Sequence, residues 1–423
     1  MASPLLVLLI MLVTFAGGVF LLRLPSGVAL ALSAVAGGLA GGFGLPIRHL
    51  VEGMFGYFDA VLIIATAMMF MKVIEATGAL GTLSHVMIER LHGSPTVLMI
   101  LVVVFVMFPG MLTGLSSVCI LTTGALVAPA LLAMGMRASS VASLLAISGV
   151  LGMIAPPINI PVMIIGGGVD MPYVGFEMPL LLATAPLALL LALYYRRHIK
   201  DSNAQEVLSQ LPPSEYGRHG LKLFFPLAVV IGLMAGIRII PATIPDIGVP
   251  LIFVIGSLCA IGTGKRFNMI HVTSAALRDA MPVMGILVGV GMFVQIMALT
   301  GVRGYLAVHA LEIPSVLLYV AIALVMPAFG SAYASASVIG IPFLFAFLGT
   351  NEIVVASALS LIAGVGDLMP PPMLLCVLGG QVTGERRPLA VLRESFWPIV
   401  GVELVGILLI IFSREVGALL QMN

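Results

Sequence analysis

Long apolar runs follow one another along this chain, separated by short segments that contain proline, glycine or charged residues. Because a membrane-spanning helix uses about 20 predominantly apolar residues, each run of this kind predicts one span. The predicted spans are 4–22, 26–45, 58–76, 140–169, 178–195, 221–240, 248–263, 281–299, 352–379 and 396–412. Of the 423 residues, 61% are apolar and 9% are charged, whereas about 25% of a soluble domain is charged. The sequence therefore predicts an all-α, multi-pass membrane protein embedded in a lipid bilayer. It excludes a soluble enzyme and a disordered protein.

Charge and cysteine usage exclude further classes. A net charge of +1 offers no basic surface for nucleic acid, so no nucleic-acid partner is expected. Cys119, Cys259 and Cys376 lie far apart within apolar runs, which indicates small core side chains rather than a metal site or a disulfide. The run 4–22 is interpreted as the first span, not as a cleaved signal, because the first basic residue, Arg23, follows it.

Two further apolar runs, 95–136 and 314–348, are interrupted midway by glycine and polar residues. The interruptions lie near 109–117 and near 327–337. Each run is long enough for two half-spans with a polar tip between them, which predicts two re-entrant hairpins. Irregular backbone is tolerated at this depth only where protein or a water-filled cavity covers it.

The lysines and arginines predict an orientation. With the N-terminus outside and each hairpin returning to its own side, the outer side holds only Arg48, Arg238, Arg303 and Arg414. The remaining 15 of the 19 basic residues then lie inside, which agrees with the positive-inside rule. The longest polar loop is then cytoplasmic and divides the chain nearly in half.

The two halves resemble each other. Residues 70–78 align without gaps on 293–301. Further matches are Ser116-Ser117-Val118 with Ser335-Ala336-Ser337-Val338, Pro129 with Pro342, and Ala155-Pro156-Pro157-Ile158-Asn159 with Met369-Pro370-Pro371-Pro372-Met373. In the predicted orientation the hairpins enter from opposite sides, so the repeats are inverted. Inverted repeats with matching broken helices are typical of secondary transporters whose site lies at the bilayer midplane.

This pattern predicts a division of the chain. The predicted parts are a first repeat over 1–195 (scaffold helices 1–57, arm and transport elements 58–195), a cytoplasmic linker over 196–220, and a second repeat over 221–423 (scaffold helices 221–263, arm and transport elements 264–423). Segments 78–94 and 264–279 mix polar and apolar residues, so we expect them to be arm helices that lie along the membrane surface.

Broken helices expose unpaired backbone groups near the bilayer centre. Carbonyl oxygens and hydroxyls there suit Na⁺, and helix N-termini suit a substrate carboxylate. The predicted substrate-binding residues are Thr113, Ser116, Ser117, Pro157, Asn159, Ser331, Ser335 and Ser337. The predicted Na⁺ ligands are Gly114, Ser116, Ala155, Gly330, Ser335, Gly364, Gly366 and Asp367.

Two polar residues at the breaks carry more than one interpretation. Asn159 follows Pro156-Pro157, which remove two N–H donors, so it either lines the site or caps the helix that resumes there. Asp367 is an acid within a predicted span, and such a residue marks a functional site by default. It would neutralise a coupling Na⁺, carry a proton, or cap the short helix after the break.

Taken together, several of these segments resemble the large, DctM-like membrane subunit of TRAP transporters, a family within the ion-transporter superfamily. The resemblance rests on Gly114-Leu115-Ser116-Ser117-Val118, Gly124, Pro129-Ala130, Ile154-Ala155-Pro156-Pro157-Ile158-Asn159-Ile160-Pro161 and Gly168-Val169-Asp170. It covers most of the chain and is strongest over 55–190.

The resemblance implies a Na⁺-coupled importer of small organic acids, such as dicarboxylates, in a bacterial or archaeal cytoplasmic membrane. It implies two partners, a small four-helix membrane subunit and a periplasmic substrate-binding protein, and an elevator-type movement of the hairpins. It implies that the residues which contact substrate and Na⁺ are Ser116, Ser117, Pro157 and Asn159, with Gly330, Ser335, Gly364 and Gly366 in the second half.

The chain departs from the family pattern at two positions. Leu115 stands where a smaller residue is usual, and Asp367 stands where no acid is expected. A one-component Na⁺- or H⁺-coupled carrier of organic anions from the same superfamily therefore stays an alternative.

Two other classes fit less well. Gly364-Val365-Gly366-Asp367 matches the GxGD motif of intramembrane aspartyl proteases, but its partner acid would be Asp59, at the outer end of another span. Such proteases need two carboxylates that share a site, and the inverted repeat has no part in that mechanism. A passive channel lacks support because no filter-like carbonyl motif or ring of charges is found. We therefore expect no enzymatic activity and no organic cofactor.

Overall fold

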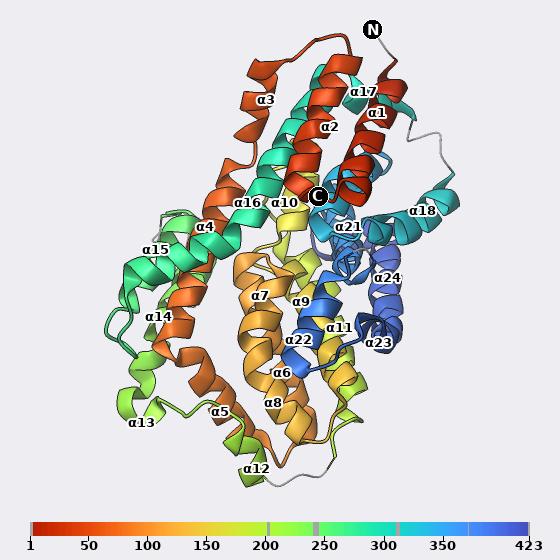
Figure 1. Cartoon of the computed structure of the whole chain (residues 1–423). Coiled ribbons are helices and arrows are strands. Elements are labelled where there is room, and N and C mark those ends of the chain that lie inside the picture. The colour runs from red at the N-terminus through yellow and green to blue at the C-terminus, as the bar shows by residue number, and fades with distance from the viewer. Residues whose placement is uncertain (1–2, 201–203, 240–244, 310–313, 371, 422–423) are drawn as a thin grey trace.

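A computed structural model describes residues 3–200, 204–239, 245–309, 314–370 and 372–421. Within these ranges the secondary structure is helical and contains no strand (Figure 1). Among the described residues, seven helices are long and apolar enough to cross a membrane, and an eighth is obtained if α23 and α24, bent by 55° where they meet, count as one span. The predicted all-α, multi-pass membrane fold is confirmed.

The first half runs from α1 to α11. Its elements are α1 (Pro4–Ala16), the π-helical segment η1 (Gly17–Leu21), α2 (Ser26–Ala40), α3 (Ile47–Met54), α4 (Phe58–Thr77), α5 (Ala79–Leu91), α6 (Pro95–Thr113), α7 (Ser116–Cys119), η2 (Ile120–Gly124), α8 (Ala125–Ala133), α9 (Ala138–Ile154), α10 (Ile160–Gly167) and α11 (Glu177–Arg196). The predicted span 140–169 is therefore two helices, α9 and α10, separated by a break.

The second half follows the linker. Its elements are α12 (Ala204–Ser209), α13 (Tyr216–His219), η3 (Gly220–Phe224), α14 (Phe225–Ile239), α15 (Val249–Cys259), α16 (Met269–Leu299), α17 (Val302–His309), α18 (Ser315–Ala328), α19 (Ala332–Ser335), η5 (Ala336–Gly340), α20 (Ile341–Phe345), α21 (Glu352–Val365), η6 (Gly366–Leu368), α22 (Leu374–Thr383), α23 (Pro388–Glu394), α24 (Phe396–Ile411) and α25 (Ser413–Leu419).

The same series of elements occurs in both halves. A long helix, a short helix, a hairpin, a broken helix and a closing helix appear as α4, α5, α6–α8, α9/α10 and α11, and again as α16, α17, α18–α20, α21/α22 and α24. The gapless sequence match 70–78 with 293–301 falls at the ends of α4 and α16, just before the short helices. The predicted hairpins and broken helices are therefore present.

One predicted element is wrong. Segment 264–279 was expected to be a separate arm helix, but α16 runs without a break from Met269 to Leu299, a length of about 46 Å at 1.5 Å per residue. No glycine or proline interrupts it before Pro282, and Lys72 of α4 lies 3.2 Å from Asp279 and neutralises this acid within the helix. The short helix at the position matching α5 is α17 instead.

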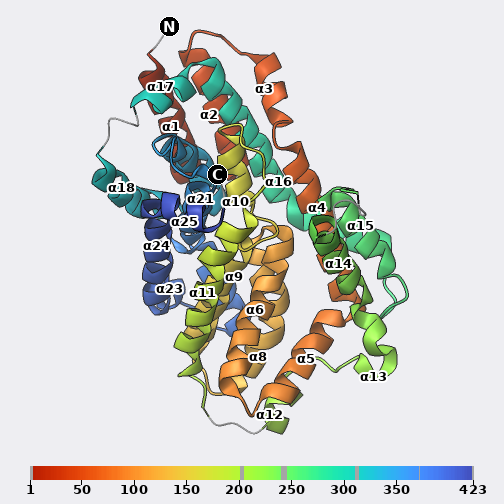
Figure 2. The ribbon, with the colours of Figure 1, turned by 180° about the vertical axis from the view of Figure 1, so that it is seen from behind.

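Glycines allow α16 to pack closely on α2 and α3. A Cβ atom at Gly27 of α2 would lie 2.6 Å from the carbonyl carbon of Gly285, and a Cβ atom at Gly53 of α3 would lie 2.5 Å from the carbonyl oxygen of Gly291. Small residues are the usual means by which membrane helices approach each other. As a result α2, α3, α4 and α16 form one packed unit beside the hairpins (Figures 1 and 2).

Replacing Gly291 by alanine is expected to destabilise this unit. The new methyl group would overlap the carbonyl oxygen of Gly53, and overpacking of this kind costs about 1–3 kcal/mol. Gly285→Ala is the control on the same helix, because a Cβ atom there meets nothing within 4 Å. Thermal unfolding of the purified proteins in detergent measures the difference, and equal midpoints would contradict the close packing.

Candidate functional site

Both hairpin tips turn at a glycine in the left-handed region. Gly114 follows α6 with a φ of 68°, and Gly330 precedes α19 with a φ of 66°. L-residues with a side chain rarely adopt this backbone conformation, so each glycine lets the chain reverse after its descending helix. Each returning arm is a continuous helical stretch, Ser116–Ala133 and Ala332–Phe345.

Asp367, at the break between α21 and α22, joins the two tips. Ser116 of the first hairpin donates its hydroxyl to Oδ2 of Asp367 at 2.6 Å. Ala332 of the second hairpin donates its backbone N–H to Oδ1 at 2.8 Å. Asp367 is only 3% exposed. Its carboxylate therefore receives one hydrogen bond from each tip. Asp367 does not cap the short helix after the break, as one interpretation of the sequence held, because α22 has no side-chain cap; it caps the hairpin helix that starts at Ala332 instead.

A second bond joins the tips directly. The hydroxyl of Tyr333 donates to the backbone carbonyl of Gly114 at 2.8 Å. Gly114 was predicted as a Na⁺ ligand, and its carbonyl oxygen is thus already engaged in this conformation. Tyr333 was not among the predicted site residues, although it lies within the predicted second tip. That position could have indicated a role at the site, but no local pattern indicated its bond to Gly114.

Asn159 holds the first broken helix together. Its side chain accepts from the N–H of Val162 at 2.9 Å, and so caps α10. Its amide donates to the carbonyl of Ile154 at 3.0 Å and to the hydroxyl of Ser360, on α21, at 2.9 Å. Asn159 is fully buried. The capping interpretation is confirmed, and the same side chain also joins the two broken helices.

A cavity of about 820 Å³ lies between the tips and the first helices of the chain. The residues predicted from the sequence that line this cavity are Ser116, Ser117, Gly330, Ser331 and Asp367. The remaining predicted residues, which do not line it, are Thr113, Gly114, Ala155, Pro157, Asn159, Ser335, Ser337, Gly364 and Gly366. The structure therefore brings the polar ends of both tips to one cavity, and the other predicted residues do not line it.

The predicted residues outside the cavity differ in their contacts. Thr113 donates to the carbonyl of Pro109 at 2.8 Å, and Ser337 donates to that of Ala334 at 3.1 Å. The carbonyl of Pro157 accepts from the hydroxyl of Tyr173 at 3.0 Å. Ser335 alone among these side chains is fully buried with a hydroxyl that has no hydrogen-bond partner within the described ranges.

The opposite wall of the cavity comes from helices outside the hairpins and was not predicted from the sequence. It includes Phe15, Phe20 and Arg23 from the start of the chain and Asp279 and Val283 from α16. Phe15 stacks on Phe329 of the second hairpin, with ring centroids 6.1 Å apart. The wall is thus mainly apolar, with one acid and one base.

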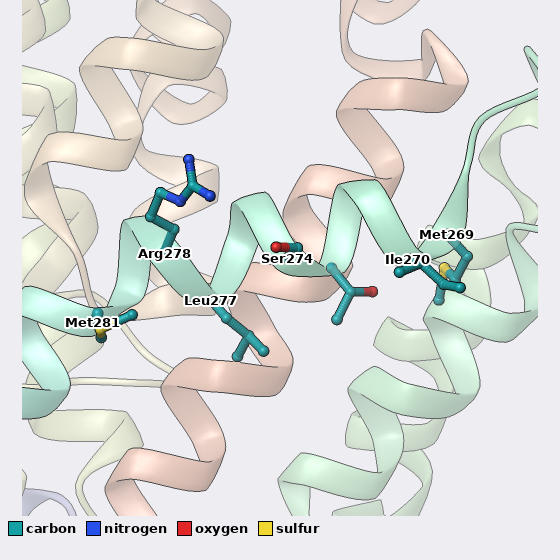
Figure 3. A pocket seen from close by; sticks show the side chains of 7 residues that line it. Met269, Ile270, Ser274, Leu277, Arg278 and Met281 are labelled. Atoms are coloured by element: carbon teal, nitrogen blue, oxygen red, sulfur yellow. The ribbon is translucent and has the colours of Figure 1, made fainter.

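A hollow elsewhere on α16 contains none of the predicted residues. It has a volume of about 560 Å³ and is lined by residues of the first turns of α16, among them Met269, Leu277, Arg278 and Met281 (Figure 3). All of its lining residues come from this single helix, so the cavity between the tips is the candidate site.

The sequence matches a family model described as "Tripartite ATP-independent periplasmic transporter, DctM component" over residues 110–416. This match covers more than two thirds of the chain and includes both hairpin tips and both breaks. The chain belongs to the DctM family. No curated protein sequence matches it significantly.

Two solved transporter structures share the fold of this DctM family member. The transporter YdaH of Alcanivorax borkumensis is 17% identical, with a TM-score of 0.60 over 97% of this chain and 98% of that one. MtrF of Neisseria gonorrhoeae, described as illuminating a class of antimetabolite efflux pumps, is 15% identical, with a TM-score of 0.63 over 98% and 96%. These similarities establish a common fold and leave the substrate open.

Tyr333→Phe is expected to loosen the contact between the tips. It removes the only hydroxyl that bonds to Gly114 among the described residues, at a cost of about 1 kcal/mol. A single cysteine introduced at Ser117, on the cavity wall, should then react faster with a membrane-impermeant thiol reagent. Tyr319→Phe is the control, because it also removes a tyrosine hydroxyl but keeps the ring that stacks on Phe347. The rate of thiol labelling at position 117 should be unchanged in this control. An unchanged rate in Tyr333→Phe would contradict the role of this bond.

Proposed function

We propose that this DctM family member is the large membrane component of a Na⁺-coupled importer of small organic acids. The observation that carries the proposal is the cavity between the two tips, where Asp367 receives hydrogen bonds from both hairpins. The chain then works as a transporter and has no catalytic residues.

The substrate is proposed to bind against the polar tips. Ser116, Ser117 and Ser331 supply hydroxyls on the cavity wall, and the helical stretches that start at Ser116 and Ala332 direct their N-terminal ends to this region. Hydroxyls and helix N-termini suit a carboxylate group. The apolar wall with Phe15 and Phe20 suits the carbon skeleton of such a molecule.

Na⁺ is proposed to bind at the breaks, close to the tips. The buried hydroxyl of Ser335 without a partner and the carboxylate of Asp367 are oxygen ligands of the kind a hard cation prefers. The carbonyls of Gly114, Ala155, Gly330, Gly364 and Gly366, with the hydroxyl of Ser116, complete the proposed ligands. The carbonyl of Gly114 accepts a hydrogen bond from the hydroxyl of Tyr333 and keeps a second lone pair for a cation.

Transport is proposed to follow an elevator mechanism, in which the hairpins and broken helices move against the unit of α2, α3, α4 and α16. The proposed partners are a small four-helix membrane subunit and a periplasmic substrate-binding protein, as in the DctM family. The proposed location is a bacterial or archaeal cytoplasmic membrane, with the N-terminus outside. A one-component carrier is the second candidate, favoured by the acid at 367 that the family pattern lacks.

Uptake by proteoliposomes after a jump in external Na⁺ tests the function. The chain is reconstituted alone and then with its candidate small subunit and binding protein, and labelled organic acids are supplied. Accumulation that needs all three parts and an inward Na⁺ gradient is the expected result. Accumulation by the chain alone identifies a one-component carrier, and the absence of gradient-driven accumulation in every combination refutes coupled transport.

Asp367→Asn is expected to weaken Na⁺ binding and leave the fold intact. The amide oxygen still accepts from Ala332, but the negative charge is lost. We expect the Na⁺ concentration for half-maximal uptake to rise by about tenfold, equivalent to about 1.4 kcal/mol. Asp279→Asn is the matched control, because Asp279 lines the same cavity but is paired with Lys72. An equal rise in both variants, or in neither, would contradict a specific role for Asp367.

A further inference from the structure

Glu403 lies halfway along α24, within a helix that forms part of a predicted span. Both of its carboxylate oxygens are buried and have no hydrogen-bond partner among the residues that the structure describes. The residue lies outside the cavity described above, so the proposed function does not account for it.

The helix that carries Glu403 is otherwise apolar around it. Three residues further along, a Cβ atom at Gly406 would lie 2.6 Å from the side chain of Ile362 on α21, so this part of α24 is pressed against α21. Ile399, Val402 and Ile410 are buried on α24 itself. Glu403 itself is half-buried, and by helical spacing it shares a face of α24 with Ile399, Gly406 and Ile410. None of these three residues has a side chain that can donate to its carboxyl group.

The helices packed against α24 are α21, α11, α18, α23 and α25. Their titratable or charged groups are Glu352 on α21, Glu177, Tyr194, Tyr195 and Arg196 on α11, Tyr319 on α18, Arg393 and Glu394 on α23, and Arg414 and Glu415 on α25. All except Tyr319 lie in the first or last turn of their helix. Tyr319 stacks on Phe347, and Glu394 is bound by Arg137 and Ser140. No ion pair compensates a charge at Glu403 in the described part of the chain.

Physical chemistry limits what such a carboxyl group can be. An ionised carboxylate that is buried without a partner costs several kcal/mol, whereas a protonated carboxyl group lacks the charge and most of this cost. A residue that served packing alone would be apolar, and an acid inside a membrane span marks a functional site by default. The ligand that fits this position is a proton.

We propose that Glu403 is a proton-binding site in the part of the molecule that carries the broken helices, and that one proton crosses the membrane with each transported organic acid. This inference rests on the proposed function and adds a proton to Na⁺ as a second coupling ion. In the reaction, the carboxylate takes a proton from water on one side of the membrane, forming one O–H bond. That bond breaks when the proton returns to water on the other side, and no electron transfer is involved.

The test compares wild type, Glu403→Gln and Glu415→Gln in the proteoliposome assay, at a fixed Na⁺ gradient with and without an inward pH gradient of one unit. Glutamine has the shape of the protonated acid and should preserve folding and Na⁺-driven uptake. Glu415 lies on the exposed surface of α25 and supplies the matched control. For one coupled proton, a difference of one pH unit should raise the accumulation ratio about tenfold in wild type and in Glu415→Gln, and leave it unchanged in Glu403→Gln.

A second measurement is independent of uptake. Infrared spectra of wild type in lipid at acid and alkaline pH should contain a carboxylic-acid carbonyl band that is lost at alkaline pH and is absent from Glu403→Gln at every pH. A band that persists at every pH, or a pH-gradient response that remains in Glu403→Gln, overturns the proposal. If no variant accumulates any organic acid, the proposed function fails, and the infrared band alone then decides whether Glu403 exchanges a proton.

Discussion

Backbone groups at membrane depth must find hydrogen-bond partners within the protein, and the site of this transporter depends on that constraint. Two hairpins and two broken helices interrupt the regular helical bonding. Asn159 caps α10 and reaches Ser360 on the other broken helix, while Asp367 caps the returning arm of the second hairpin and binds Ser116 of the first. The residues that satisfy each break therefore also connect it to the opposite half of the molecule.

The helices beside the hairpins follow a different physical rule. Glycine lets α16 approach α2 and α3 until backbone meets backbone, and the ion pair of Lys72 with Asp279 joins α4 to α16. Close approach of this kind is usual between membrane helices that pack through small residues. The hairpin side instead has hydrogen bonds between its tips, such as that from Tyr333 to Gly114, which can break and form again. The two walls of the cavity are thus held together by different kinds of contact.

Local sequence signals predicted the hairpins and the broken helices. Proline and glycine at residues 109–117 and 327–337 indicated the hairpins, and Pro156-Pro157 indicated the first break, because these residues act on their own backbone. The side-chain bonds were not predictable in the same way. Ser116 and Asp367 are 251 positions apart, and no local pattern indicates that they meet. The continuity of α16 was missed because the pairing of Asp279 with Lys72, which neutralises a charge inside the helix, is likewise a contact between distant segments.

Two buried acids on neighbouring helices differ in their surroundings, and the difference separates their chemistry. Asp367 receives a hydrogen bond at each oxygen and lines a cavity, so its carboxylate oxygens can be reached by a cation. Glu403 receives none among the described residues and lies on an otherwise apolar helix, so a proton, which removes the charge, suits it. Oxygen ligands beside a cavity favour a metal cation, whereas a lone carboxyl group in an apolar contact favours a proton. The surroundings of the two acids therefore differ in the kind of ion they suit, and this difference is the basis on which the two proposals assign them separate roles.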